Sequence, residues 1–240
     1  MIGEIRNAQG ERIDHTFTPA AGEGSRELVV IGHGVTGNKD REWAVTLAET
    51  LAAAGYASLR FSFSGNGDSE GDFRESTPSK EAEDLGAVLD QCTDWDVTYI
   101  GHSMGAAVGV LRASRDDRIK RLVSLAGMVE TADFAARKFG ELKPDVDVMW
   151  DKPECPLSQT FLDDMNSIDS VSDLAEEVLV PWLFIHGTED TVVPIEESDM
   201  ILTRAGGSAD FIDLTGVDHV FSGEGAATMA ARVVGWLKEH

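Results

Sequence analysis

The sequence has little positive charge for its length. Its 240 residues include 20 Lys and Arg against 43 Asp and Glu, which gives a formal net charge of −23 and an isoelectric point near 4.4. Nucleic acid and anionic membranes attract basic proteins, so this imbalance argues against both as partners. No apolar run approaches the ~20 residues of a membrane span, and residues 1–15 lack the apolar core of an export signal. We therefore expect a cytoplasmic protein.

Cysteine is also scarce. The two cysteines, Cys92 and Cys155, have neither the CxxC spacing of redox sites nor the spacing of metal ligands. They predict two unpaired thiols in a reducing compartment, and the sequence indicates no metal site.

The chain has no internal repeat, and short β-prone runs alternate with segments of helical periodicity. A turn at Gly10 predicts an N-terminal hairpin. The expected strands are 27–34, 56–65, 97–101, 119–127, 180–187 and 209–216, and the expected helices are 40–55, 77–92, 103–114, 195–205 and 224–239. This alternation predicts an α/β fold with a mostly parallel central sheet and helices on both faces. Such sheets bind ligands beyond the carboxyl ends of their strands.

Residues 128–176 break this alternation, because they separate two expected strands by far more than one crossover helix needs. We interpret them as a small inserted cap on a single domain of residues 1–240. Apolar residues such as Met149, Trp150 and Phe161 favour a packed cap over a disordered linker. Trp150 and Phe161 are also the candidate substrate contacts.

The segment GHSMG, residues 101–105, stands between an expected strand and an expected helix. A serine at such a bend needs a positive or nearly positive φ, and the turn is so tight that side chains two positions away would clash. Gly101 and Gly105 remove that clash. The amides of the following helix favour negative charge near Ser103. The pattern predicts a nucleophile, with a serine that merely caps the helix as the alternative.

A serine needs a base to become a good nucleophile. Among the six histidines, His219 follows the last expected strand in a loop rich in turn residues, and it is the candidate base. His33 and His102 belong to glycine-flanked loops, where we expect them to shape the pocket. His186 stands at the end of a strand.

The base needs an orienting carboxylate, and residues 184–194 offer two. Asp190 is the better candidate because it stands in the middle of the loop, before an apolar run, and Glu189 is the fallback. Asp218 would have to fold back onto its own neighbour, His219, and is not expected to serve.

An oxyanion also needs donors. The first expected donor is the backbone N–H of Met104, directly after the serine. The second expected donor is the N–H of Val35, in the glycine-rich loop 32–40. This loop lacks the GK[ST] ending of a phosphate-binding loop, so we expect no nucleotide.

Together these segments resemble the α/β-hydrolase superfamily, and most of all its small bacterial feruloyl/cinnamoyl esterase-like branch. The matching segments are 33–39, 60–73, 101–105, 157–165, 181–194 and 216–221, in the order of the family. The resemblance implies an α/β-hydrolase fold in which Ser103 is the nucleophile, Asp190 the acid and His219 the base. It also implies an oxyanion hole from Val35 and Met104, and a substrate-shaping cap.

Two features depart from that branch. Met104 stands where its members often have Gln or Leu, and the only tyrosines, Tyr56 and Tyr99, both fall in expected strands. The cap therefore has no tyrosine hydroxyl to anchor a phenolic substrate.

The expected function is a serine hydrolase that cleaves a small-molecule carboxylic ester through an acyl-enzyme intermediate, without metal or cofactor. A thioesterase or small peptidase with the same machinery is the nearest alternative, because one fold hosts many reactions. A hydrolase-derived ligand sensor with little turnover is the alternative from another class. No motif indicates an oligomeric state.

Overall fold

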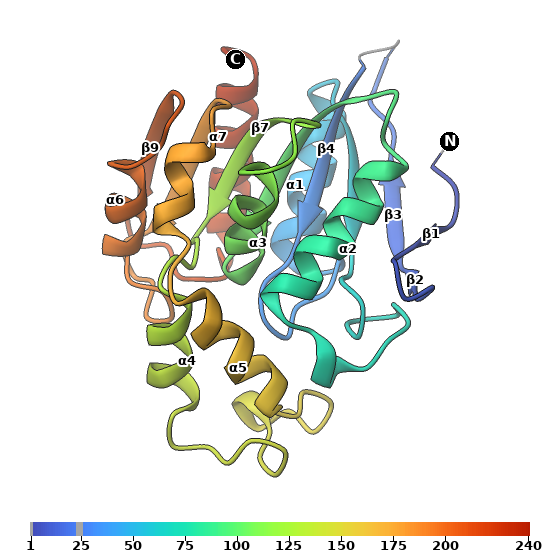
Figure 1. Ribbon diagram of the computed structural model, residues 1–240. Coiled ribbons are helices and arrows are strands. Elements are labelled where there is room, and N and C mark those ends of the chain that lie inside the picture. The colour runs from blue at the N-terminus through green and yellow to red at the C-terminus, as the bar shows by residue number, and fades with distance from the viewer. Residues whose placement is uncertain (1, 23–25) are drawn as a thin grey trace.

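The computed structural model describes residues 2–22 and 26–240, and its central feature is a seven-stranded sheet (Figure 1). The strand order is β3-β5-β4-β6-β7-β8-β9. The strands are β3 (His15–Thr18), β4 (Glu27–Gly32), β5 (Ala57–Phe61), β6 (Asp96–His102), β7 (Ile119–Leu125), β8 (Trp182–Gly187) and β9 (Ala209–Leu214). Only the edge strand β3 runs antiparallel to its neighbour, β5. The expected mostly parallel sheet is confirmed.

The expected N-terminal hairpin is present beside this sheet. It pairs β1 (Ile5–Arg6) with β2 (Arg12–Ile13), and Gly10 turns the chain with a φ of 80°. The expected strand 56–65 is shorter than the sequence pattern indicates. It ends at Phe61 because Gly65 and Gly67 adopt positive φ values of 77° and 55° and turn the chain out of the sheet.

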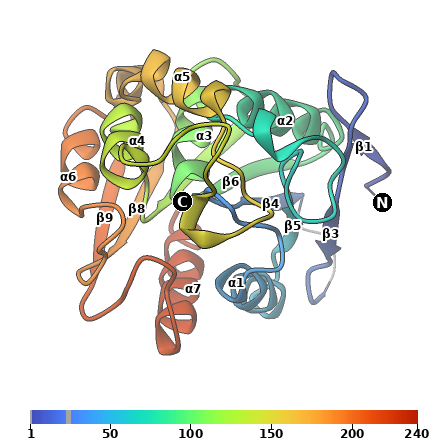
Figure 2. The same cartoon turned by 90° about the horizontal axis from the view of Figure 1, so that it is seen from below.

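The main helices are α1 (Glu42–Ala53), α2 (Pro78–Asp90), α3 (Met104–Ala113), α6 (Glu196–Leu202) and α7 (Glu224–Leu237), with a short 3-10 turn η1 (Phe73–Glu75). Figure 2 shows α1 and α7 on one face of the sheet and α2 and α3 on the other. Successive strand side chains point to opposite faces. In β4, Leu28 and Val30 pack on the α2/α3 side, while Val29 and Ile31 pack on the α1/α7 side. Both faces of the sheet are thus covered by helices. A ligand site on the sheet is therefore expected at the ends of the strands.

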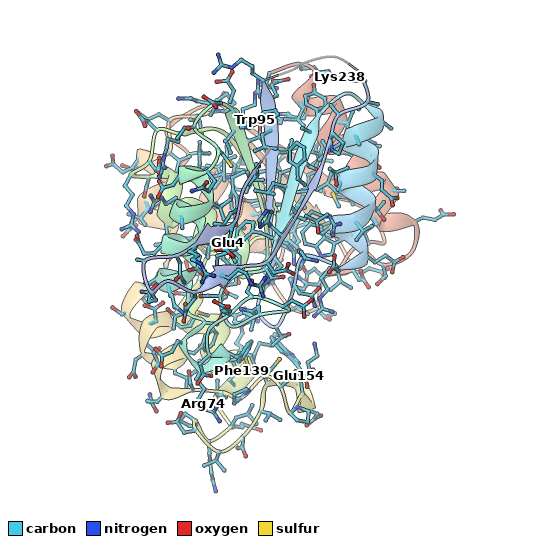
Figure 3. The ribbon with its side chains drawn as sticks, turned by 90° about the vertical axis from the view of Figure 1, so that its right-hand side faces the viewer. Glu4, Arg74, Trp95, Phe139, Glu154 and Lys238 are labelled. Carbon is cyan, nitrogen blue, oxygen red and sulfur yellow. The ribbon has the colours of Figure 1, made fainter. Side chains whose placement is uncertain are left out.

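The segment 128–176, which we call the cap, leaves the sheet after β7 and returns before β8. It contains α4 (Thr131–Phe139), η2 (Met149–Asp151) and α5 (Gln159–Ile168), and η3 (Ser172–Glu177) ends one residue beyond it. Figure 1 shows α4 and α5 beyond the carboxyl ends of the parallel strands. In Figure 3, Phe139 and Glu154 mark this end of the molecule, and Trp95 and Lys238 mark the other.

The cap has an apolar cluster of its own, which we call the cap cluster. Its fully buried members from the cap include Phe134, Phe139, Met149, Leu157, Phe161 and Met165. Met104 of α3 and Val193, in the loop after β8, complete the cluster, and Val35 packs against it. The cap is therefore packed against the segments that carry Val35, Met104 and Asp190.

Two further properties concern the described residues. Cys92 and Cys155 are both buried and unpaired, as the sequence predicts. Within residues 2–22 and 26–240, no helix is both long enough and apolar enough to cross a lipid bilayer.

Candidate active site

Ser103 lies at the bend between β6 and α3. Its φ of 54° and ψ of −121° form the strained turn that the sequence predicts, and its amide donates a hydrogen bond to Leu125 O at 2.9 Å. A Cβ on Gly101 would come within 2.1 Å of Gly105 O, and a Cβ on Gly105 within 2.4 Å of His33 O. Only glycine fits at both positions, and the two glycines therefore allow the chain to form the tight bend at Ser103.

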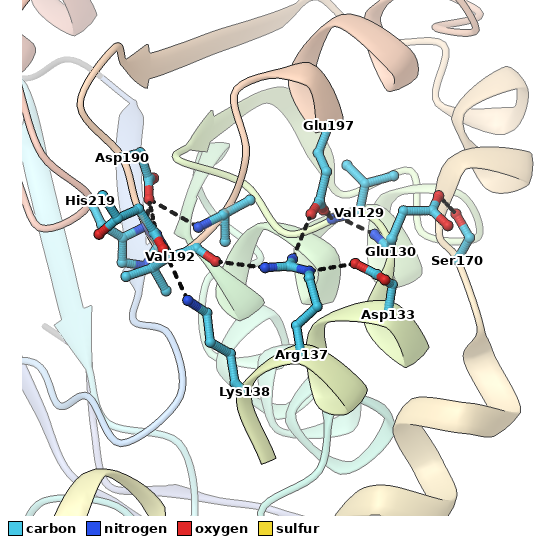
Figure 4. Close-up of polar contacts among 12 residues, drawn as sticks. Val129, Glu130, Asp133, Arg137, Lys138, Ser170, Asp190, Val192, Glu197 and His219 are labelled. Carbon is cyan, nitrogen blue, oxygen red and sulfur yellow. Dashed lines mark hydrogen bonds and ion pairs between the residues drawn. The ribbon is translucent and has the colours of Figure 1, made fainter. Parts of the chain in front are cut away.

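His219 and Asp190 lie in direct contact, although 28 residues separate them in the chain. His219 Nδ1 is 2.7 Å from Asp190 Oδ2. Because a carboxylate only accepts hydrogen bonds, Nδ1 carries the proton and Nε2 is left as an acceptor. Asp190 Oδ1 accepts the amides of Val192 at 2.7 Å and Val193 at 2.9 Å. Figure 4 shows Asp190 beside His219 and Val192. The Asp190 side chain is fully buried, whereas that of His219 is 11% exposed.

These contacts also set the charge of Asp190. Burial alone raises the pKa of this carboxyl. The hydrogen bonds from His186 and His219, together with the nearby backbone amide of Val193, outweigh burial and hold the pKa below its usual range. Asp190 is therefore ionised near neutral pH, as a group that orients an imidazole must be.

His186 forms a second imidazole contact with the same carboxylate, which sequence reasoning missed. Its Nε2 lies 3.1 Å from Asp190 Oδ2 and 3.1 Å from Val193 O, and its Nδ1 lies 2.8 Å from Ser198 Oγ. A carbonyl oxygen cannot donate, so Nε2 carries the proton and the Ser198 hydroxyl donates to Nδ1. The signal in the sequence was the spacing of four residues from His186 to Asp190 across a strand end.

Both ring nitrogens of His33, and Nε2 of His102, form hydrogen bonds with backbone groups. His33 Nδ1 donates to Gly34 O at 2.9 Å, and its Nε2 accepts the Phe63 amide at 3.1 Å. His102, which is the last residue of β6, donates from Nε2 to His219 O at 2.8 Å. Burial lowers the pKa of His33 to about 4 and that of His102 to about 3. Both rings are neutral at pH 7.

The two other acidic candidates lie differently. Glu189 is exposed, and its amide donates to Val217 O at 3.0 Å. Asp218 Oδ1 accepts the Ser222 amide at 2.8 Å within its own turn. Asp190 is the carboxylate that the fold brings to His219.

The expected oxyanion donors both stand next to Ser103. Met104 is the first residue of α3, and Val35 follows Gly34. A Cβ on Gly34 would lie 2.7 Å from Ser103 Cβ and 3.2 Å from its Oγ, so glycine permits this close approach. Among the described residues, the amides of Val35 and Met104 donate no hydrogen bond. Both N–H groups are available to a ligand oxygen.

A cavity of about 380 Å³ opens at this end of the sheet. Ser103 and His219 line it from the sheet side, and Trp150 lines it from the cap. Trp150 is 42% exposed and meets Phe139 edge to face at 4.9 Å. Phe161 is 2% exposed in the cap cluster and is not among the residues that line the cavity. The structure thus places Trp150 at the cavity but Phe161 in the packing behind it.

Charged side chains tie α4 of the cap to the loop that carries Asp190 (Figure 4). Lys138 Nζ donates to Thr191 O at 2.9 Å, and Arg137 Nη1 donates to Val192 O at 3.4 Å. Sequence reasoning did not find these contacts, because their partners are backbone carbonyls more than fifty residues away.

Glu197 of α6 completes this connection. Its Oε2 accepts the amides of Val129 at 2.7 Å and Glu130 at 3.0 Å, where the cap begins. Its Oε1 accepts Arg137 Nη2 at 3.2 Å. The cap, α6 and the loop that carries Asp190 are therefore joined by charge-assisted hydrogen bonds, which are buried at Val129 and exposed at Thr191 and Val192.

Known proteins share this architecture. The family described as the alpha/beta hydrolase fold matches residues 27–147. Est1E from Butyrivibrio proteoclasticus, solved with ferulic acid bound, is 25% identical with a TM-score of 0.88, covering 99% of this chain and 98% of that chain. The human mitochondrial palmitoyl-protein thioesterase ABHD10 is 27% identical over 173 residues, which is 67% of this chain. The chain matches 56% of that relative's length.

Proposed function

Because the chain belongs to the α/β-hydrolase family, we propose that it is a serine hydrolase that cleaves small-molecule carboxylic esters. The observation that carries the proposal is the hydrogen bond of His219 to Asp190, with His219 and Ser103 in one cavity. An elbow serine, an imidazole with a free nitrogen and a buried carboxylate are the three groups that this acyl transfer uses.

In the proposed mechanism, Ser103 Oγ attacks the ester carbonyl while His219 Nε2 takes its proton. Asp190 keeps the proton of His219 on Nδ1 and stabilises the imidazolium that forms. His186 positions Asp190 by donating to the same oxygen, so the carboxylate cannot rotate away from His219 without losing two hydrogen bonds.

The tetrahedral intermediate places a negative charge on the former carbonyl oxygen. The free amides of Met104 and Val35 are the proposed donors to it, and α3 adds the positive end of its dipole. The alcohol leaves with the proton from His219, and the acyl group stays on Ser103. Water, activated by His219, then releases the acid.

A thioester is the second candidate substrate. Human ABHD10 is named a palmitoyl-protein thioesterase, and its resemblance to this chain favours acyl chemistry at sulfur as well as at oxygen. The same three residues serve both reactions, because the attack and the oxyanion are the same and only the leaving group differs.

The test is covalent labelling with a fluorophosphonate, followed by rates on matched ester, thioester and amide substrates. We expect labelling of the wild type that Ser103→Ala abolishes, together with a loss of roughly 10³-fold or more in kcat. Esters should turn over continuously. A burst of product without sustained turnover would instead favour a ligand sensor, and full activity of Ser103→Ala would overturn the proposal.

A further inference from the structure

Two cationic side chains, Arg41 and Lys152, line the cavity that holds Ser103. This is unusual in a chain with a net charge of −23, where cations elsewhere are commonly paired, as Arg112 is with Asp116 at 2.7 Å. Within the described part of the chain, neither Arg41 nor Lys152 forms an ion pair. Both cations therefore line the cavity without a carboxylate in direct contact.

The two cations reach the cavity from opposite walls and meet at Thr36. Arg41 stands directly before α1 and donates from Nη2 to Thr36 O at 2.7 Å. Lys152 belongs to the cap, and its Nζ lies 3.4 Å from Thr36 Oγ1. These are their only hydrogen bonds among the described residues, so each head group keeps N–H donors for another acceptor.

The positive charge extends to the catalytic side of the cavity. The charge of Arg41 contributes, after burial, to the low pKa of His33, and it contributes less to that of His102, where burial and His219 act more strongly. One carboxylate, Glu42, also lines the cavity, so two cations stand against one anion while the two histidines are neutral. Negative charge dominates the rest of the chain, and the cavity is the exception.

From this placement we infer that Arg41 and Lys152 form an anion subsite, which selects substrates bearing a carboxylate apart from the scissile ester. The inference rests on the proposed function and adds the substrate class to it. A guanidinium and an ammonium that are both partly withdrawn from water bind a carboxylate more strongly than exposed cations do. A neutral ester would leave both cations unpaired in the cavity.

The experiment compares esters that differ only by methylation of a remote carboxylate. One pair carries it on the acyl side: 4-nitrophenyl hydrogen adipate and 4-nitrophenyl methyl adipate. The other carries it on the alcohol side: 3-carboxyphenyl acetate and its methyl ester. We expect kcat/KM of the wild type to favour the charged member of at least one pair by about 10-fold or more, as charge-assisted hydrogen bonds do.

The variants Arg41→Gln and Lys152→Gln should each reduce that preference by roughly threefold or more, and together bring it close to one. Lys143→Gln is the matched control, because Lys143 is an exposed cap residue outside the cavity lining and the charge change is the same. Equal kcat/KM within both ester pairs in the wild type would overturn the inference. An equal loss of preference in Lys143→Gln would also overturn it.

Failure of the inference is distinguishable from failure of the proposed function. Continued hydrolysis of the neutral esters without a charge preference would reject the subsite and leave the hydrolase. If no ester is turned over, calorimetry of Ser103→Ala with 3-carboxyphenyl acetate and its methyl ester decides the matter. Tighter binding of the charged compound that Arg41→Gln removes would support the subsite, and equal binding would reject it.

Discussion

The two walls of the cavity are built on different principles. On the sheet side, Ser103, Asp190 and His219 are held by backbone geometry and buried hydrogen bonds, and the Asp190 carboxylate has no exposed surface. On the cap side, Trp150 is 42% exposed and takes a left-handed backbone conformation with a φ of 48°. The difference teaches that the proposed catalytic groups lie where buried hydrogen bonds and a strained turn fix their positions. The side chains that we propose to face the rest of a substrate lie on the cap.

The two walls are nevertheless joined. Met104, whose amide we assign to the oxyanion hole, packs its side chain into the cap cluster. Lys138 of α4 donates to Thr191 O, next to Asp190. A change in the cap can therefore disturb the proposed chemistry if it reaches these contacts.

The largest effect is expected on the sheet wall. Asp190→Asn should reduce kcat by on the order of 10²–10⁴-fold, because an amide favours the wrong tautomer of His219. Glu189→Gln removes one charge at the adjacent, exposed position and should change kcat by less than about threefold. Steady-state rates on 4-nitrophenyl acetate measure both. If Glu189→Gln proves the damaging variant, the acid is one residue earlier than we assign it.

The protein should also lose stability in acid, because His102, in the sheet wall, is buried as a neutral imidazole in the folded state. Its folded pKa of about 3 lies below the unfolded value near 6.5, so unfolding takes up a proton. This contribution is complete above pH 6.5 and is lost as the pH falls toward 3. Between pH 6.5 and 4.5 it amounts to about 2 kcal/mol of the free energy of unfolding.

Urea unfolding at these two pH values measures that loss. The wild type should lose about 2 kcal/mol more than His102→Gln, whose amide can still donate to His219 O. Trp150→Ala on the other wall is the control and should keep the pH dependence of the wild type. An identical slope in the wild type and His102→Gln would contradict the buried neutral state.

A smaller effect is expected from His186, which touches Asp190 and does not line the cavity. His186→Ala should lower kcat by about 10- to 100-fold and leave KM within about twofold of the wild type. The substitution removes one of the two imidazole donors that hold the Asp190 carboxylate. His186→Gln keeps a donor and should recover part of the loss. A merely structural role would lower the melting temperature of both variants without this split between kcat and KM.

The smallest effect is expected on the cap wall. Trp150→Ala should change the ratio of kcat/KM between bulky and acetate esters by about 3- to 10-fold, while acetate esters are still hydrolysed. Phe161→Ala is the matched comparison, because Phe161 packs in the cap cluster behind the cavity. It should lower the melting temperature instead. A complete loss of acetate hydrolysis in Trp150→Ala would place part of the catalytic machinery in the cap.

Much of the molecule could be predicted from the sequence, because the signals are local. The turn at Ser103 follows from the glycines two positions away on each side, since the clash they avoid lies within one bend of the chain. The strands and helices follow from hydrophobic periodicity over a few residues. His219 and Asp190 could be proposed because each stands in a loop after a strand, and parallel strands end on one side of a sheet.

Only the tertiary structure decided which side chains meet. The sequence left two candidates for the orienting carboxylate, Glu189 and Asp190. The structure distinguishes them, because Asp190 contacts two imidazoles. The sequence treated Trp150 and Phe161 alike, yet one lines the cavity and the other is buried behind it.

The approach of Arg41 to Lys152 joins positions 111 residues apart at Thr36, and no local pattern encodes that distance. Backbone conformation depends on neighbouring residues along the chain. Side-chain partnership depends on how the loops and the cap pack around a common cavity, which only the complete fold determines.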